Sequence, residues 1–316
     1  MNTDSEGLHE IANATKQDRV ADIVFVHGLG GASHATWRHG KPGDADHFFW
    51  PEEFGKDLPE YGIWSVGYPA GFTEWGKPGM IIAKRAGNLS QKLANRELGP
   101  RPIIFICHSM GGLVVKSLIV DSQVLPDSDR KSIANAVGGI VFCATPHRGS
   151  AFADAAGVLG EFFGGSQRHV DEMQANAEPL DFLHDKFVEW QHFRQIPVDT
   201  YAESQGLLRQ KWLGAAVRLP LVVPRSSANP NIARYDVNDV DDDHLTLVKP
   251  RGRSHDVYAG VLRFIRERVT PQSQFVAQLP IASTARAEPR PDLPDMGAFV
   301  QNLPQRHQSE IGRAHV

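Results

Sequence analysis

The feature that most constrains the fold of this sequence is one serine between two apolar runs, in RPIIFICHSMGGLVVKSLIV at residues 101–120. Residues 103–106 form an unbroken β-branched and aromatic run, which is typical of a strand buried on both faces of a parallel sheet. From Leu113 onward apolar positions recur at helical spacing with Lys116 between them, so a helix follows the strand within about five residues. Ser109 is therefore predicted to lie on a sharp turn at the carboxyl edge of the sheet, where open α/β folds bind ligands and present nucleophiles.

Strand-like runs alternate with helix-like segments along the rest of the chain. Helices are predicted at residues 81–98 and 257–269, where apolar side chains gather on one face. This alternation predicts an α/β fold with a mostly parallel central sheet and helices on both faces. The predicted strands are residues 20–26, 63–68, 102–107, 139–145, 196–202 and 219–223.

The domain organisation follows from changes in composition. We expect one main domain at residues 20–269, after a polar N-terminal segment at 1–19 and before a Pro/Ala-rich disordered tail at 270–316. The last residues of that tail, IGRAHV, are interpreted as an assembly artefact. Two amphipathic stripes within residues 150–195 predict either a helical cap over the active site or two helices that only cover the sheet.

The composition excludes several partner classes. The net charge of the 316-residue chain is −4 and its basic residues are scattered, so no footprint for nucleic acid is present. No apolar run approaches the roughly 18 residues of a membrane span, and the N-terminus lacks the apolar core of a signal peptide. The two cysteines, Cys107 and Cys143, lie in strand-like runs and are predicted to be buried thiols. We therefore expect a cytoplasmic protein without a transmembrane segment.

The motif HGLGG at residues 27–31 ends the first predicted strand, and its glycines allow a sharp turn that points backbone N–H groups into a site. A serine nucleophile needs such donors to stabilise an oxyanion, one after the nucleophile and one from an early loop. We assign these donors to the backbone N–H groups of Leu29 and Met110. The supporting loop residues are His27, Gly28, Gly30 and Gly111. An alternative dinucleotide-binding loop, GLGGAS, is weak because no strand ending in an acid follows about 20 residues later.

A serine hydroxyl also needs a general base and an acid that orients the base. His244 is the preferred base, because it precedes the final helix and fits the chain order Ser, Asp or Glu, His. His108 adjoins Ser109 and its ring should diverge from the hydroxyl, whereas His147 comes too early in the chain. The preferred acid is Glu203, directly after a predicted strand. The alternatives are aspartates of an acidic stretch, namely Asp236, Asp239 and Asp241 to Asp243.

Several motifs together resemble the α/β-hydrolase esterase/lipase superfamily, namely HGLGG with Trp37, WPEEFGKDLP, FICHSMGGLVVK, GIVFCATPHRGS and DHLTLVKP. Within it, the chain resembles the branch that includes the serine-active-site protein of phosphatidylglycerol remodelling, and hydrolase modules fused to NACHT, NB-ARC or repeat regions. The resemblance spans roughly residues 20–268. It implies Ser109 and His244 as catalytic residues and Glu203 at the position of the usual acid. One departure from GxSxG is Cys107 in place of glycine, and Cys107 itself is a weak alternative nucleophile.

These observations predict a serine carboxyl-ester hydrolase with an acyl-enzyme intermediate, a small-molecule or lipid ester as substrate, and neither a cofactor nor a metal. The same residues would serve an acyltransferase, and a second alternative is an effector or sensor module of a larger NLR-like protein with further domains. Peripheral membrane contact is compatible with a lipid substrate. Four aromatic residues are predicted either to form apolar walls of the substrate site or to belong to the core: Phe72, Trp75, Phe162 and Phe163.

Overall fold

The structure is a computed structural model that describes residues 6–70, 78–164, 171, 179–210 and 216–269. The predicted tail at 270–316 lies outside these residues, as do Phe72 and Trp75. Within the described ranges, no helix is both long and apolar enough to cross a bilayer.

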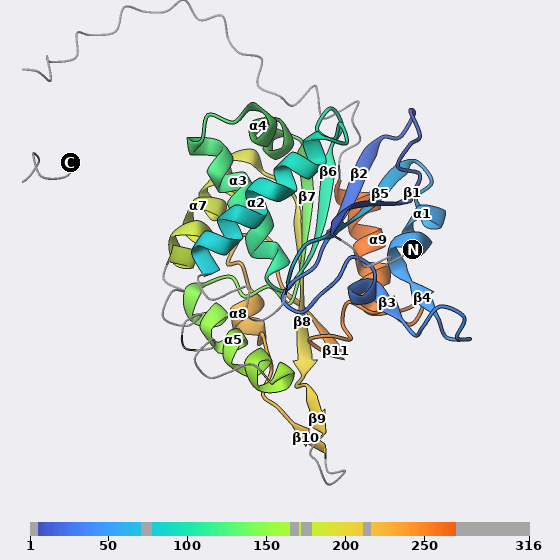
Figure 1. Cartoon of the computed structure of the whole chain (residues 1–316), viewed down its shortest axis with the longest axis vertical. Helices are drawn as coiled ribbons and strands as arrows, with labels where there is room; N and C mark the ends of the chain where they lie inside the picture. The colour runs from blue at the N-terminus through green and yellow to red at the C-terminus, as the bar shows by residue number, and fades with distance from the viewer. Residues whose placement is uncertain (1–5, 71–77, 165–170, 172–178, 211–215, 270–316) are drawn as a thin grey trace, which may run out of the picture. The chain divides into compact units, whose positions relative to one another are not determined.

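A seven-stranded sheet forms the centre of the fold, with strand order β1-β5-β2-β6-β7-β8-β11 (Figure 1). Only β1 runs antiparallel to its neighbour, so the carboxyl ends of the other six strands meet at one edge. The strands are β1 Gly7–Ala12, β2 Ala21–Val26, β5 Tyr61–Gly67, β6 Ile103–His108, β7 Val137–Cys143, β8 Val198–Gln205 and β11 Asn238–Asp243. The first of them lies within the predicted N-terminal segment.

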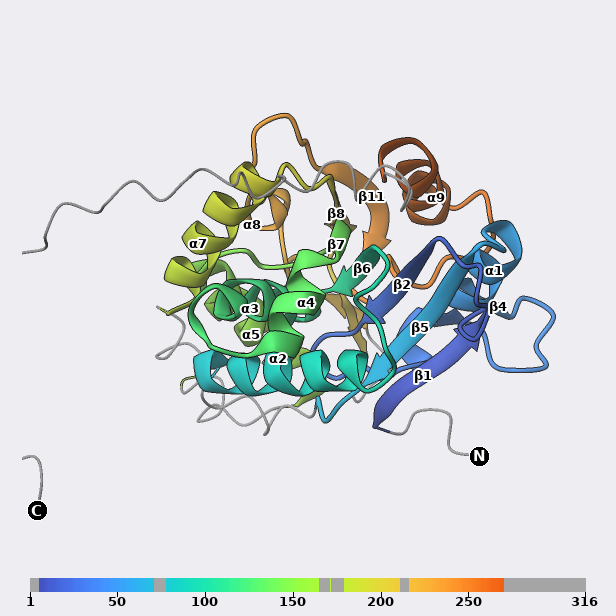
Figure 2. The ribbon, with the colours of Figure 1, turned by 90° about the horizontal axis from the view of Figure 1, so that it is seen from above.

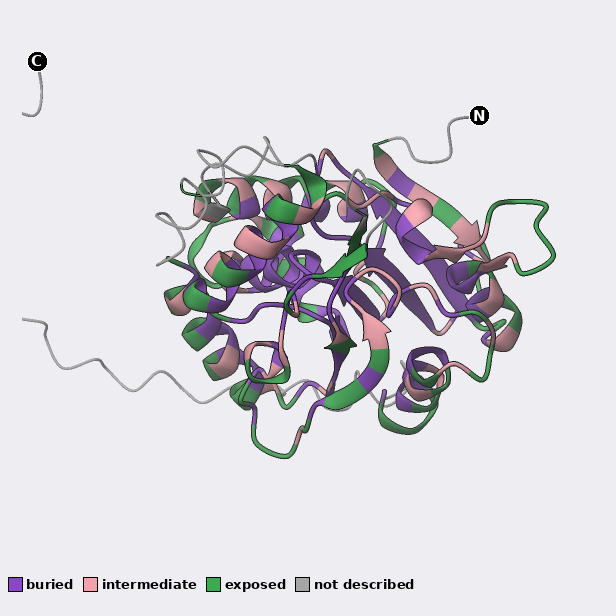
Figure 3. Cartoon of the chain, turned by 90° about the horizontal axis from the view of Figure 1, so that it is seen from below, coloured by how far each residue is buried: buried purple, intermediate pink, exposed green. Residues whose placement is uncertain are grey.

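Helices cover both faces of the sheet, as predicted (Figure 2). On one face lie α1 Trp50–Asp57 and α9 Asp256–Arg268, and on the other α2 Pro78–Ala94, α3 Gly111–Val124, α4 Ser128–Asn135 and α7 Pro179–Arg194. The sheet between them is buried over most of its length (Figure 3). The predicted helices at 81–98 and 257–269 correspond to α2 and α9.

Further elements lie at or near the carboxyl edge. Helix α5, Gly149–Phe163, and the β9–β10 hairpin are beyond the ends of the strands (Figure 1). Helix α7 instead packs beside α3 on the face of the sheet, so the two helices predicted within 150–195 occupy different places. The remaining elements are η1 Ala35–Trp37, β3 Arg38–His39, β4 Phe48–Phe49, β9 Leu208–Gln210, β10 Ala216–Arg218 and α8 Arg225–Ala228.

One predicted strand is wrong and one parallel strand was missed. Residues 219–223 form no strand, because Pro220 has no N–H and the N–H groups of Val222 and Val223 bind a carboxylate instead of a neighbouring strand. The sixth parallel strand is β11, whose sequence NDVDDD carries one buried residue, Val240. Its polarity is that of an edge strand with little apolar area to bury, which hides it from an analysis of hydrophobic runs.

The contact between α3 and β2 requires glycine. A Cβ atom on Gly111 would clash with the carbonyl oxygen of Val26 and lie 2.6 Å from that of His27. A side chain here would push the first turn of α3 away from the sheet. The turn that precedes α3 is therefore held close to the carboxyl end of β2.

Lys116 of α3, His147 and His184 form a buried basic cluster. The side chain of Lys116 is fully buried, and its Nζ lies 2.6 Å from Nδ1 of His147 and 2.8 Å from Nδ1 of His184. The rings of Phe142 and Phe187 flank the same amine, 5.6 and 5.1 Å from it. Since lysines between apolar helix positions usually reach solvent, no sequence pattern pointed to this cluster. It joins α3, the loop before α5, and α7.

The two histidines of this cluster make the stability dependent on pH. Burial, with a smaller effect of Lys116, lowers the pKa of His147 well below its usual value and that of His184 to about 3. An unfolded histidine has a pKa near ~6.5, so below that pH the unfolded chain binds more protons than the folded chain. Their contribution to the free energy of unfolding is therefore complete above about pH 6.5 and is lost as the pH falls toward the folded-state values.

We predict that lowering the pH from 7 to 5 decreases the free energy of unfolding, by up to ~1.4 kcal/mol per pH unit for each buried histidine. Urea unfolding at both pH values measures this, and His184→Gln should make the pH dependence shallower. The matched control is His192→Gln, at an exposed position of α7. An unchanged pH dependence in His184→Gln would contradict the prediction.

Candidate active site

Ser109 lies on the turn between β6 and α3, as the sequence predicted, and its backbone has φ +52°. A non-glycine residue in this left-handed region is strained by roughly 1–3 kcal/mol, so neighbouring groups must hold it. Its N–H donates to the carbonyl of Cys143 at 2.8 Å, and its carbonyl accepts from the hydroxyl of Thr145 at 2.9 Å. The end of β7 thus fixes the conformation of this turn.

His244 follows β11 directly, and its ring lies between two other predicted site residues. Its Nε2 is 3.0 Å from Oγ of Ser109, and its Nδ1 is 2.6 Å from a carboxylate oxygen of Glu203. All three residues are at most 2% exposed. Residues that are far apart in the sequence therefore form one hydrogen-bonded chain at the carboxyl edge of the sheet.

The second carboxylate oxygen of Glu203 also accepts hydrogen bonds. It accepts from the N–H groups of Val222 and Val223, at 2.5 and 2.9 Å. Glu203 lies on β8, beside Val240 of β11, so the strand pairing that places the acid also places the start of the histidine loop. The loop at 219–223, predicted as a strand, is therefore a support for the acid.

The aspartates that compete with Glu203 in the sequence have other partners. Arg225 binds both Asp236 and Asp239, at 2.7 and 2.6 Å. Asp241 accepts from Gln205, Asp242 pairs with His255, and Asp243 accepts the N–H groups of the turn after His244. None of these carboxylates hydrogen-bonds to His244 within the described chain, so Glu203 is the acidic neighbour of this ring.

The HGLGG loop lies against the turn that carries Ser109. A Cβ atom on Gly28 would be 2.7 Å from Cβ of Ser109 and 3.0 Å from the backbone nitrogen of Met110. The N–H groups of Leu29 and Met110 donate to no other residue that the structure describes. The predicted donor of Leu29 lies on the HGLGG loop and that of Met110 on the turn after Ser109, and these two segments are in contact beside the serine.

The segment after β5 supports the HGLGG loop from behind. The hydroxyl of Tyr68 donates to the carbonyl of His27, and the two rings stack with centroids 4.1 Å apart. The N–H of Gly30, whose φ is +67°, donates to the carbonyl of Ala70 at 2.7 Å. Sequence analysis missed Tyr68, because its role depends on strand order rather than on a local motif.

Other candidates from the sequence lie away from the hydroxyl of Ser109 or face elsewhere. His108 binds the carbonyl of His244 through Nε2 at 2.9 Å, and His147 belongs to the buried basic cluster. Cys107 is fully buried within β6, and burial raises the pKa of its thiol, which disfavours a nucleophilic thiolate. Cys107 and Cys143 are both buried free thiols, as predicted.

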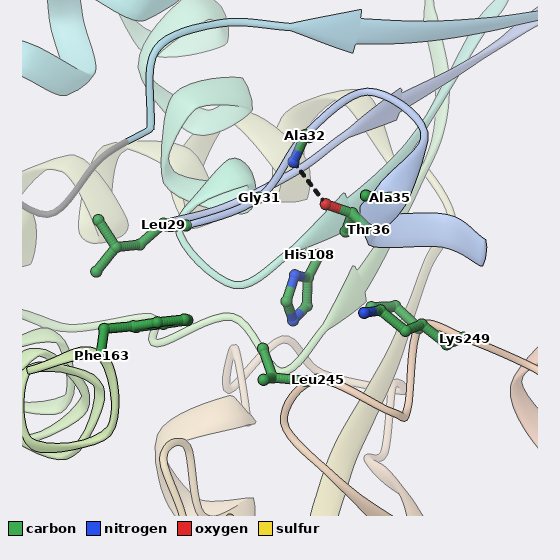
Figure 4. A pocket seen from close by; sticks show the side chains of 11 residues that line it. Leu29, Gly31, Ala32, Ala35, Thr36, His108, Phe163, Leu245 and Lys249 are labelled. Atoms are coloured by element: carbon green, nitrogen blue, oxygen red, sulfur yellow. Dashed lines mark hydrogen bonds between the residues drawn. The ribbon is translucent and has the colours of Figure 1, made fainter. Parts of the chain in front are cut away.

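A pocket of about 180 Å³ adjoins the site (Figure 4). Its lining includes Leu29, His108, Leu245 and the ring of Phe163, whereas Phe162 packs against the core. No group of three or more His, Cys, Asp or Glu residues in the described ranges could hold a metal ion.

The chain is similar in sequence to the vertebrate protein SERAC1. It is 32% identical over 269 residues to protein SERAC1 of Homo sapiens, across 80% of this chain and 40% of that protein. It is 30% identical over 271 residues to SERAC1 of Danio rerio, with the same coverage. The chain thus spans about two-fifths of the length of these relatives. No protein-family model matches it.

Comparison with solved structures identifies the fold. Phospholipase PlaB from Legionella pneumophila, in complex with thio-NAD, has a TM-score of 0.53 and 13% identity, over 81% of this chain and 60% of that one. A second structure of phospholipase PlaB from Legionella pneumophila has a TM-score of 0.52 and 13% identity, over 83% of this chain and 62% of that one. The mostly parallel sheet, the serine on its strand-to-helix turn and the similarity to SERAC1 place the chain in the α/β-hydrolase superfamily.

Proposed function

We propose that the chain is a serine hydrolase that cleaves carboxylic esters through an acyl-enzyme intermediate. The observation that carries this proposal is the hydrogen-bonded chain from Ser109 through His244 to Glu203, with distances of 3.0 and 2.6 Å. Next to a carboxylate, Nδ1 of His244 carries the hydrogen, which leaves Nε2 free to accept the serine proton. The arrangement matches what a weak hydroxyl nucleophile needs.

The reaction follows from these positions. Oγ of Ser109 attacks the ester carbonyl carbon while Nε2 of His244 takes the hydroxyl proton, and the oxyanion forms beside the N–H groups of Leu29 and Met110. The carbon–oxygen bond to the alcohol then breaks, and the alcohol leaves with the proton from His244. Water, deprotonated by the same Nε2, then attacks the acyl-enzyme carbonyl. The bond to Oγ breaks, the acid leaves, and His244 returns its proton to Oγ, which regenerates Ser109. Glu203 orients the ring and stabilises its charged form throughout.

The substrate class that we propose is a small-molecule or lipid ester. Apolar side chains line the pocket beside the site, and the fold is shared with a phospholipase. A second alcohol could replace water in the last step, and product analysis with added alcohol distinguishes acyl transfer from hydrolysis. Because the chain matches only part of its relatives, further domains in a longer protein are compatible with this proposal.

The nucleophile is tested by Ser109→Ala. We expect hydrolysis of 4-nitrophenyl butyrate to fall roughly 10⁴-fold or more and labelling by a fluorophosphonate probe to disappear, while the melting temperature stays near that of the parent. Ser254→Ala, at an exposed position, is the matched control. Retention of more than a tenth of the activity would overturn the assignment.

The oxyanion loop is tested by Gly28→Ala. The added Cβ atom would press against Ser109 and the nitrogen of Met110, so both donors should shift. We expect kcat/KM to fall about 100-fold, the effect of losing roughly 3 kcal/mol of transition-state stabilisation. Gly252→Ala, where a Cβ atom meets nothing within 4 Å, should change neither activity nor folding. Normal kinetics in a folded Gly28→Ala protein would exclude this loop from the role.

The acid is tested by Glu203→Gln. The amide is similar in shape and lacks the negative charge that stabilises protonated His244, so kcat should fall by at least 100-fold, by analogy with the loss of the acid in serine proteases. Asp241→Asn is the control, because its carboxylate binds Gln205 instead of His244. The assignment fails if Glu203→Gln keeps parental kinetics or if Asp241→Asn causes the larger loss.

A further inference from the structure

The pocket beside the site is formed by direct sequence neighbours of the proposed catalytic groups. His108 precedes Ser109, Leu245 follows His244, and Leu29 carries a proposed oxyanion donor, and all three line the pocket (Figure 4). The pocket therefore lies against residues that directly flank the proposed catalytic groups in the sequence. The polarity and charge of the other lining residues determine which chemical group fits.

Most of the wall is apolar. It contains Ala32, Ala35, Phe163 and Val248 in addition to the two leucines. A volume of about 180 Å³ is similar to the roughly 150 Å³ of a cavity that binds benzene, so the pocket has room for a short chain or a small group. Shape and polarity alone would fit a short apolar chain.

Lys249 adds a positive charge to this mostly apolar wall. Its side chain is partly buried, and its ammonium group points across the pocket toward His108 (Figure 4). It forms no ion pair with any residue in the described ranges. Asp243 is the carboxylate that acts on it, and this carboxylate already accepts the N–H groups of Leu245 and Thr246.

The electrostatics at Lys249 favour an added anion. Partial burial lowers the pKa of Lys249, Arg38 lowers it further, and Asp243 only partly opposes them. A cation in such a place loses part of its hydration and, apart from the field of Asp243, gains no ion pair in the described ranges, so a bound anion would add a favourable interaction. An ion pair with the ammonium group of Lys249 would therefore contribute favourably to the binding free energy of an anionic ligand.

His108 and Thr36 are the other polar residues of the wall, and the hydroxyl of Thr36 already accepts from the N–H of Ala32. Nε2 of His108 donates to the carbonyl of His244, so in the neutral ring Nδ1 is an acceptor. Burial lowers the pKa of His108 well below its usual value, and Lys249 and His244 add to this effect. No described residue binds the buried Nδ1 atom. The His108 ring therefore adds no positive charge to the wall at neutral pH, and Lys249 is the charged residue of the described lining.

We propose that this pocket is a recognition site for an oxyanion of the substrate, a carboxylate or a phosphate, which binds Lys249 while a short apolar linker lies along Leu29 and Phe163. The site selects esters with a negative charge a few atoms from the reacting carbonyl. This inference rests on the proposed ester hydrolysis for its biological meaning, whereas binding of the anion does not require turnover.

Binding is measured first, by titration calorimetry of the parent chain with hexyl phosphate, hexanoate and 1-hexanol. The two anions should bind at least tenfold more tightly than the alcohol. Lys249→Met should abolish this difference and Lys249→Arg should keep it, because arginine retains the charge. Lys84→Met, at an exposed position of α2, is the control and should bind like the parent. A stronger effect for phosphate or for carboxylate identifies which oxyanion the site prefers.

Hydrolysis is measured second, with 4-nitrophenyl esters of adipic acid and of its monoamide, which differ in one charge. We expect kcat/KM to favour the charged ester at least tenfold in the parent and to be equal for the two esters in Lys249→Met. Equal binding and equal hydrolysis of charged and neutral ligands in the parent would overturn the anion site while Ser109-dependent hydrolysis still supported the proposed function. Lys249-dependent anion binding without Ser109-dependent hydrolysis would support the site and overturn the proposed function.

Discussion

The close approach of α3 to the end of β2 is the contact on which the arrangement of the site depends. Gly111 lies against the carbonyls of Val26 and His27, and Gly28 lies against Ser109. Each of the two segments thus presents a glycine to the backbone of the other. The turn at Ser109 and the HGLGG loop are separated by about 80 positions in the sequence, and this pair of contacts holds them in van der Waals contact. The carboxyl end of β7, through Cys143 and Thr145, then fixes the strained turn at Ser109 from the other side.

Much of the fold and of the candidate site could be predicted because the signals were local. Five of the six predicted strands are present, since strands buried on both faces must be continuously apolar. Ser109 and the HGLGG loop could be recognised because a strand-to-helix turn needs small residues at fixed positions. The geometry around Glu203 is also the one expected from its place directly after an apolar run. In each case the local pattern predicted the position of the residue at the carboxyl edge, whereas contacts from other segments, such as those of Cys143 with Ser109 and of Val222 with Glu203, complete its surroundings.

The features that escaped prediction depend on contacts between distant segments. Strand β11 has a single buried residue, so its place in the sheet comes from pairing with β8 rather than from its own composition. Lys116 is buried because two histidines from other elements happen to meet its amine. Tyr68 supports the HGLGG loop because β5 and β2 are neighbours in the sheet. Strand order decides the first and the third, and the packing of α7 against α3 decides the second. No hydrophobic period encodes either arrangement.

The β9–β10 hairpin has a consequence for how such a molecule can diversify. It projects beyond the carboxyl edge, it pairs only with itself in the sheet arrangement, and Leu208 and Val217 on it are 53% and 36% exposed. Loops at this edge tolerate insertion, because they contribute little buried area to the core. We expect homologous chains to differ in length here while the glycine contacts beneath stay constant. Evolution could then reshape access to the edge of the sheet without endangering the folding of the domain.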